Sequence, residues 1–184
     1  VDAESVSGAL IFSDPNYNFL GNSINYSISN EKNDKPDQGY ENTLTAASVG
    51  TSFEQYKDVF LSLGLSASYD DLRTDSSASA ALKKQEGTYN ELSGNYGLSM
   101  DTRDRPFMPT SGSILTFSQS LPIYADKSFV ANRFSASKYK YLNENVVGVG
   151  KFYLSTINGL GSDDVRISKR QGLSKNRLRG FERS

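Results

Sequence analysis

The side chains that could do chemistry in this 184-residue chain are of few kinds. The sequence contains no His and no Cys, so the commonest general base, the commonest metal ligand and any thiolate nucleophile are missing. Catalysis by a Ser–His or Cys–His pair is therefore excluded within this sequence. Two acidic pairs remain: Asp70–Asp71, where a predicted strand passes into a connection, and Asp163–Asp164, within a predicted connection. We expect them to be solvated turn charges rather than a metal site.

Charge and composition exclude two further classes of protein. Lys and Arg number 20 and Asp and Glu number 21, so the net charge of -1 gives no general attraction for nucleic acid or anionic lipid. Mean hydropathy is -0.52, and the longest apolar runs are tetrapeptides such as residues 9–12. Since a membrane-spanning helix needs about 20 mostly apolar residues, a helical membrane span is excluded.

The two ends of the chain carry no start or stop signal of their own. It begins Val-Asp-Ala-Glu, without Met or a signal peptide, and ends at Arg-Gly-Phe-Glu-Arg-Ser. We expect it to be an internal fragment of a longer protein.

Apolar residues recur at every second position along most of the chain. Between Val59 and Tyr69, for example, Val and Leu alternate with Ser and Gly. Successive side chains of a strand point to opposite faces, so this period predicts strands with one apolar and one polar face. Turn-forming residues separate the segments, which favours antiparallel neighbours. The pattern predicts an all-β fold with eight strands, at 5–13, 22–30, 40–51, 58–71, 87–101, 112–123, 127–141 and 145–157.

The eighth segment breaks the alternation. Val147 and Val149 have one parity, whereas Phe152 and Leu154 have the other. A β-bulge near Lys151 would bring all four side chains to one face, and we predict one there.

Two all-β architectures share this alternation, a soluble sandwich and an outer-membrane barrel. The strands are longer than the usual five to six residues, and their polar face is mostly Ser, Gly, Asn and Thr. Tyr and Phe collect near the strand ends, as in the aromatic girdles of barrels. These details favour the barrel. The in-strand charges should then face the lumen or lie near a bilayer interface; they are Arg133, Lys138, Lys140 and Lys151.

The connection at residues 100–113 carries the first motif. Pro109 fixes φ and ends a strand ladder, Gly112 permits a strained turn, and charges cluster between them. The segment resembles the D-[RN]-x-x-x-P-[TS]-x-G turn of the BamA-type outer-membrane assembly (bacterial surface antigen) barrel family. The match falls at Asp104, Arg105, Pro109, Thr110 and Gly112.

A second motif lies near the end of the chain. Residues 178–181 resemble the [VL]-R-G-[FY] motif of the same family, at Arg179, Gly180 and Phe181. In the family this motif lies in the long sixth external loop, folds into the lumen and pins the loop through its Arg. A guanidinium makes bidentate bonds to a carboxylate, which suits that role. Its acidic partner should lie beyond Ser184.

The resemblance implies a fold and a function. In the family, the turn follows strand eight and the loop follows strand eleven, so residues 1–184 would be part of one barrel domain, strands four to eleven of sixteen, with the long loop at 158–184. The full protein would fold and insert β-barrel proteins into the bacterial outer membrane, without enzymatic activity, nucleotide, metal or other cofactor. Its partners would be outer-membrane lipid, unfolded outer-membrane proteins, and accessory lipoproteins that bind POTRA domains outside this chain, with no nucleic acid.

Two alternatives stay open at this point. One is a barrel of the same superfamily that secretes polypeptides or assembles autotransporters. The other is a soluble β-sandwich adhesin or carbohydrate-binding module.

Loop lengths predict the orientation of the barrel, because periplasmic turns are short and external loops longer. We expect residues 31–39, 72–86, 124–126 and 158–184 to be external, and residues 14–21, 52–57, 102–111 and 142–144 to be periplasmic.

Overall fold

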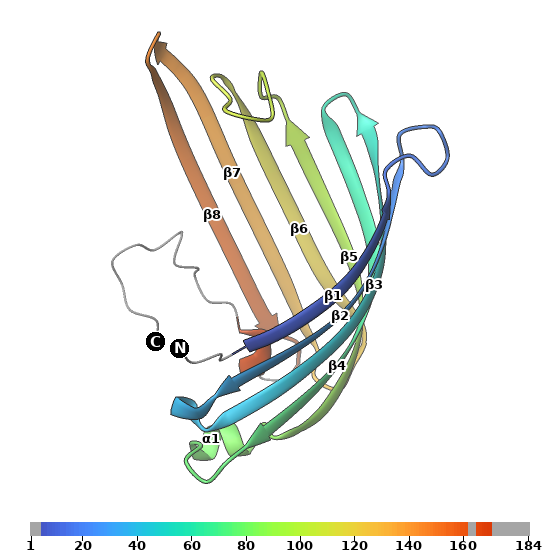
Figure 1. Ribbon diagram of the computed structural model, residues 1–184, viewed down its shortest axis with the longest axis vertical. Coiled ribbons are helices and arrows are strands. Elements are labelled where there is room, and N and C mark those ends of the chain that lie inside the picture. The colour runs from blue at the N-terminus through green and yellow to red at the C-terminus, as the bar shows by residue number, and fades with distance from the viewer. Residues whose placement is uncertain (1–4, 162–164, 171–184) are drawn as a thin grey trace.

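The computed structural model describes residues 5–161 and 165–170, and it is built around one antiparallel sheet (Figure 1). The eight strands pair in chain order, each with its sequence neighbour, so the predicted all-β fold of eight consecutive strands is confirmed. The strands are β1 (Ser5–Asp14), β2 (Ser23–Lys35), β3 (Tyr40–Tyr56), β4 (Val59–Thr74), β5 (Gly87–Asp101), β6 (Gly112–Ala125), β7 (Phe129–Asn143) and β8 (Val146–Gly159). Three short helical segments complete the fold: η1 (Pro36–Gln38), α1 (Ala80–Lys83) and η2 (Ile167–Lys169).

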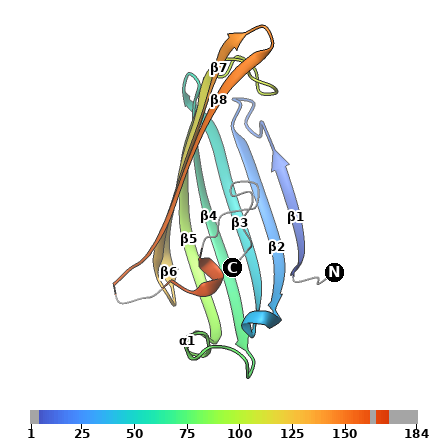
Figure 2. The same cartoon turned by 90° about the vertical axis from the view of Figure 1, so that its left-hand side faces the viewer.

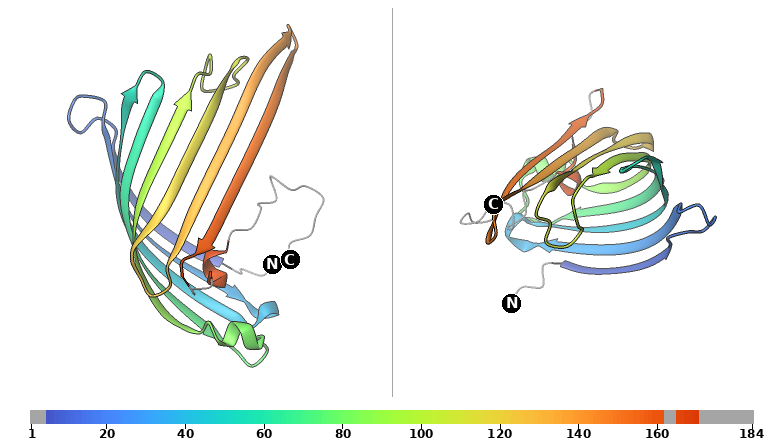
Figure 3. Two further views of the ribbon diagram at one scale, coloured as in Figure 1. Left: turned by 180° about the vertical axis from the view of Figure 1, so that it is seen from behind. Right: turned by 90° about the horizontal axis from the view of Figure 1, so that it is seen from above.

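The sheet curls into an open trough, which is clearest in the end-on view of Figure 3. In the described part of the chain no second sheet covers either face, so a two-sheet sandwich is wrong. None of the described helical segments has the length and apolar character of a membrane-spanning helix.

The strand register separates the two faces of the sheet. Leu61, Leu98 and Phe117 pair directly across β4, β5 and β6 and belong to the outer, convex face. The neighbouring row, Ser62, Gly97 and Ser118, belongs to the inner, concave face. The outer face carries most of the large exposed hydrophobic side chains of the strands, among them Val6, Leu10, Phe12, Ile28, Val49, Leu63, Leu65, Leu98, Leu121, Phe152 and Leu154.

The connections differ between the two ends of the trough. We call the end with residues 15–22, 57–58, 102–111 and 144–145 the turn end, and the end with residues 36–39, 75–86, 126–128, 160–161 and 165–170 the loop end. At the loop end β2 and β4 run three to five residues beyond the predicted limits of 30 and 71, to Lys35 and Thr74. Residues 31–35 of β2 are polar, whereas the end of β4 begins with the buried Leu72 and continues with Arg73 and Thr74; in both strands the ladder of backbone hydrogen bonds continues.

The predicted bulge near Lys151 is wrong. β7 and β8 pair without a shift from Phe129↔Gly159 to Tyr141↔Val147, and the irregularity lies at the turn, between Tyr141 and Asn143. Val149 stands opposite Tyr139 and faces inward, whereas Leu154 stands opposite Phe134 and faces outward. The alternation breaks because the inner wall is apolar near the turn end, not because the backbone shifts.

Candidate functional site: the inner wall and the base of the long loop

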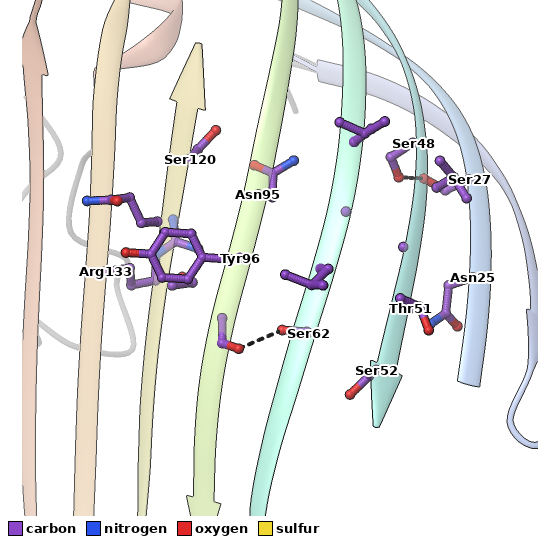
Figure 4. Close-up of a pocket in the computed structure, with 18 of the residues that line it drawn as sticks. Asn25, Ser27, Ser48, Thr51, Ser52, Ser62, Asn95, Tyr96, Ser120 and Arg133 are labelled. Atoms are coloured by element: carbon purple, nitrogen blue, oxygen red, sulfur yellow. Dashed lines mark hydrogen bonds between the residues drawn. The ribbon is translucent and has the colours of Figure 1, made fainter. Parts of the chain in front are cut away.

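The middle of the inner wall is lined by small uncharged polar side chains (Figure 4). Ser27 and Ser48 hydrogen bond to each other at 2.7 Å, and Asn95 Nδ2 donates to Ser66 Oγ at 2.9 Å. Such groups bond to one another, to water or to a passing polar chain at little cost, because hydroxyls rotate to suit their partners. This surface suits a hydrated lumen.

The structure places the four in-strand charges that were named from the sequence on both faces of the sheet. Arg133 faces inward from β7, and its Nε donates to the hydroxyl of Tyr153 at 3.1 Å. Lys151 also faces inward, since it stands opposite Ser137. Lys138 and Lys140 lie on the outer face, in the half of β7 nearest the turn end.

A cluster of four charges lies at the loop end, where residues 165–170 fold against the inside of β4 and β5 (Figure 2). At its centre Asp70 is fully buried, with an exposure of 0%. Arg166 Nη1 donates to Asp70 Oδ2 at 2.8 Å, and Asn42 Nδ2 donates to its other oxygen at 3.3 Å. The prediction that Asp70 is a solvated turn charge is therefore wrong: it lies within β4, and the loop covers it.

The second acid of the cluster is Glu91, on β5. Lys169 Nζ lies 3.0 Å from Glu91 Oε2 and forms an ion pair with it. Arg166 Nη2 lies 3.9 Å from the same oxygen, and Ser93 Oγ donates to the other carboxylate oxygen at 2.5 Å. The cluster thus combines two acids and two bases, and its formal charge is zero.

Aromatic rings complete the surroundings of the two cations. The guanidinium carbon of Arg166 lies 4.2 Å from the ring centre of Tyr89, and Lys169 Nζ lies 5.8 Å from that of Phe129. Both distances fall within the range of cation–π attraction. The backbone N–H of Ile167 donates to Gln85 Oε1 at 2.9 Å, so the connection between β4 and β5 also holds the loop.

The buried side chains of the described residues gather at this end of the trough. They are Asn42, Asp70, Leu72, Ala78, Glu91, Ser93, Phe129 and Arg166. The described residues contain no group of three or more acidic side chains that could hold a metal ion. The arrangement is therefore a packed salt-bridge site, and the chemistry it supports is adhesion of one segment to another.

The turn motif at the other end is ordered by Asp104. Its carboxylate accepts hydrogen bonds from the backbone N–H of Thr110 at 2.9 Å and of Ser111 at 3.1 Å, and from the Thr110 hydroxyl at 2.6 Å. Because these donors favour the charged form, the pKa of Asp104 is lowered to about 2. The turn therefore depends on an ionised carboxylate.

The other motif residues of the turn have separate roles. Arg105 Nε donates to the carbonyl of Met108 at 2.8 Å, and Met108 itself has a positive φ of 49°. Gly112 has a φ of 91°, and a Cβ there would overlap the carbonyl oxygen of Thr102. Pro109 lies between them, before β6 begins. The structure thus brings together Asp104, Thr110 and the backbone around Gly112.

The second motif, Arg179, Gly180 and Phe181, lies outside the described residues, as do Asp163 and Asp164. Arg166 and Glu91 were not singled out from the sequence. No local spacing marks them, since Arg166 meets Asp70 across 96 residues.

Comparisons with known proteins agree with this geometry. No curated protein sequence matches the chain. Among solved structures, the chain is similar to BamA from Haemophilus ducreyi lacking POTRA domains 1–3, with a TM-score of 0.78 and 21% identity over 90% of this chain. That match covers 35% of the solved chain, so the present chain corresponds to about a third of its length. The sequence profile of the Omp85 superfamily domain matches residues 2–184. The chain therefore belongs to the Omp85 superfamily of non-enzymatic assembly and transport barrels, which reside in the bacterial outer membrane.

Proposed function

We propose that this chain is the central wall of an outer-membrane protein assembly factor, a barrel that folds and inserts other β-barrel proteins. The observation that carries the proposal is the similarity of the described sheet to the BamA barrel, together with a turn motif and an Arg-Gly-Phe motif in the family's order. Residues 1–184 would belong to one barrel domain.

Strand numbering and orientation follow from the same proposal. The turn motif joins β5 to β6, and three strands separate it from the Arg-Gly-Phe segment. With the turn after strand eight, β1 to β8 become strands four to eleven of sixteen. The loop end then faces outside and the turn end faces the periplasm, since barrels have longer external loops.

Arg179, Gly180 and Phe181 would pin the distal part of the long loop in the lumen. Arg is always charged and can bond a carboxylate through two parallel N–H groups, so one residue could hold a long segment. Gly180 would let the backbone turn beside it.

The mechanism assigned to the whole protein is templating by a strand edge. A barrel that opens between its first and last strands presents unpaired N–H and C=O groups, to which an incoming strand can add. Under the proposed numbering, β1 to β8 lie between those two strands and provide a fixed wall. The partners would be lipid on the apolar outer face, unfolded outer-membrane proteins, and accessory lipoproteins bound to POTRA domains.

Reconstitution of the full-length protein in liposomes tests the proposal. Urea-denatured outer-membrane barrel proteins should acquire heat-modifiable mobility and protease protection faster in these liposomes than in empty ones. Transport of a secreted polypeptide into the vesicles, with no acceleration of barrel insertion, would instead support the sibling function of polypeptide secretion. Assistance limited to autotransporter substrates would support the autotransporter-assembly function.

A further inference from the structure

We infer that Arg166 and Lys169 are positioning residues that fix the first residues of the long loop to the inner wall, as an anchor separate from Arg179. The inference goes beyond the proposed function, because it concerns the position of the loop and holds whichever substrate the barrel serves. It rests on the buried cluster formed with Asp70 and Glu91.

The inner wall carries a negatively charged site, the socket, that is formed by strand residues alone. Asp70 and Glu91 lie on adjacent strands, in the pairs Asp70↔Tyr89 and Ser68↔Glu91, and both face inward. Asn42 on β3 and Ser93 on β5 donate hydrogen bonds to them. Two carboxylates that lie on adjacent strands and are both shielded from water repel each other unless positively charged side chains neutralise them. The socket therefore selects a segment that brings two positive charges.

The loop supplies these charges in matching positions. Arg166 and Lys169 are three residues apart across η2, and side chains with this spacing eclipse in a 3-10 helix. Both reach the wall: their side chains are only 4% and 17% exposed. Arg170, the next residue, is exposed, and its Nε donates to the loop's own Val165 carbonyl. A positive charge in this segment is therefore not sufficient to place a side chain against the inner wall.

Loss of either cation should release the loop. Without Arg166, the buried Asp70 would lose the ion pair that joins it to the loop, and removal of one partner of a buried ion pair is strongly destabilising in other proteins. The segment would escape this cost by leaving the wall, so that water reaches both carboxylates. Lys169 is less buried and holds one acid, so its loss should release the loop less often.

A thiol reporter measures this release. The chain has no Cys, so Ile167→Cys in the purified full-length protein places a unique thiol of this chain in the half-buried loop base, between the two cations. A membrane-impermeant maleimide should label it slowly in the parent. In Arg166→Ala the labelling rate should rise at least about tenfold, the change that 1.4 kcal/mol of lost anchoring produces. Lys169→Met should give a smaller rise, and Arg170→Ala, the matched control, none.

Heat-modifiable mobility separates release from unfolding. Arg166→Ala should keep the mobility of a folded barrel while the labelling rate rises. If Arg166→Ala does not fold, Lys169→Met decides, because it retains the Arg166–Asp70 pair. The proposed anchor is refuted if Lys169→Met is labelled at the parental rate. It is also refuted if Arg166→Ala and Arg170→Ala are labelled at equal rates. If the labelling rate rises as much in Arg179→Ala as in Arg166→Ala, the anchor formed by Arg166 and Lys169 is not independent of Arg179.

Discussion

The assignment of the two faces of the sheet can be tested at adjacent positions of one strand. Leu65 and Ser66 lie near the middle of β4, at almost the same depth. Leu65 faces outward, opposite Val49 and Gly94, and its exposure is 49%. Ser66 faces inward and accepts a hydrogen bond from Asn95. Substitution of each by Arg therefore adds the same charge to the two sides of the wall.

The expected magnitudes differ widely. An Arg on the lipid face near the bilayer midplane destabilises a barrel by about 2–4 kcal/mol, roughly a 30- to 1,000-fold fall in the folded-to-unfolded ratio. On the inner face the Arg side chain meets water, and Ser66→Arg loses one hydrogen bond, worth about 0.5–1.5 kcal/mol. At the middle of these ranges, about 3 against about 1 kcal/mol, Leu65→Arg should lower that ratio about thirtyfold more than Ser66→Arg.

Urea titration of the full-length protein in lipid vesicles measures the comparison. The folded fraction is obtained from heat-modifiable mobility, which needs no intrinsic fluorophore. The midpoint for Leu65→Arg should fall well below that for Ser66→Arg. Equal midpoints, or a lower one for Ser66→Arg, would mean that the apolar face does not meet lipid.

Three further changes address the turn and the distal loop. Gly112→Ala should lower the thermal midpoint, because a Cβ at its positive φ overlaps a carbonyl oxygen, whereas Gly150→Ala, with open space around its Cβ, should not. The lowered pKa of Asp104 means that its contribution is complete above about pH 4 and is lost as the pH falls toward 2. An acid-active protease should then cut the turn near pH 2, and in Asp104→Asn the cleavage rate should depend less on pH. A cleavage rate that does not change with pH in the parent would refute this role of Asp104. Arg179→Ala should slow barrel insertion severalfold and Arg177→Ala should not, and parental rates in both would contradict the proposed pinning role.

Much of the fold could be predicted from the sequence because the signal is local. Alternation in β4 follows from one apolar and one polar face, and it needs no knowledge of distant residues. The end of β2 was missed because residues 31–35 are polar on both faces, and the end of β4 because its last two residues, Arg73 and Thr74, are polar, although both ends still pair. The reversed parity at Val149 was attributed to a bulge because the sequence does not show that the inner wall can be apolar near the turn end.

The salt-bridge cluster could not be found by the same reasoning. Asp70 follows Tyr69 and precedes Asp71 near the end of a strand, where most carboxylates are solvated. Only the return of the chain after β8 buries it. The turn motif was easier to recognise because Asp104 bonds residues six and seven positions away, so sequence spacing reflects contact.

The Arg166–Asp70 pair also bears on the order in which the wall folds. It joins residues 96 positions apart, whereas every strand pair links sequence neighbours. Closing a longer chain segment costs more entropy, so contacts of this kind form late. β4 and β5 can pair early, with both carboxylates still hydrated. The loop base can dock only when β6, β7 and β8 have brought the chain back, so its docking would mark the completion of this part of the barrel.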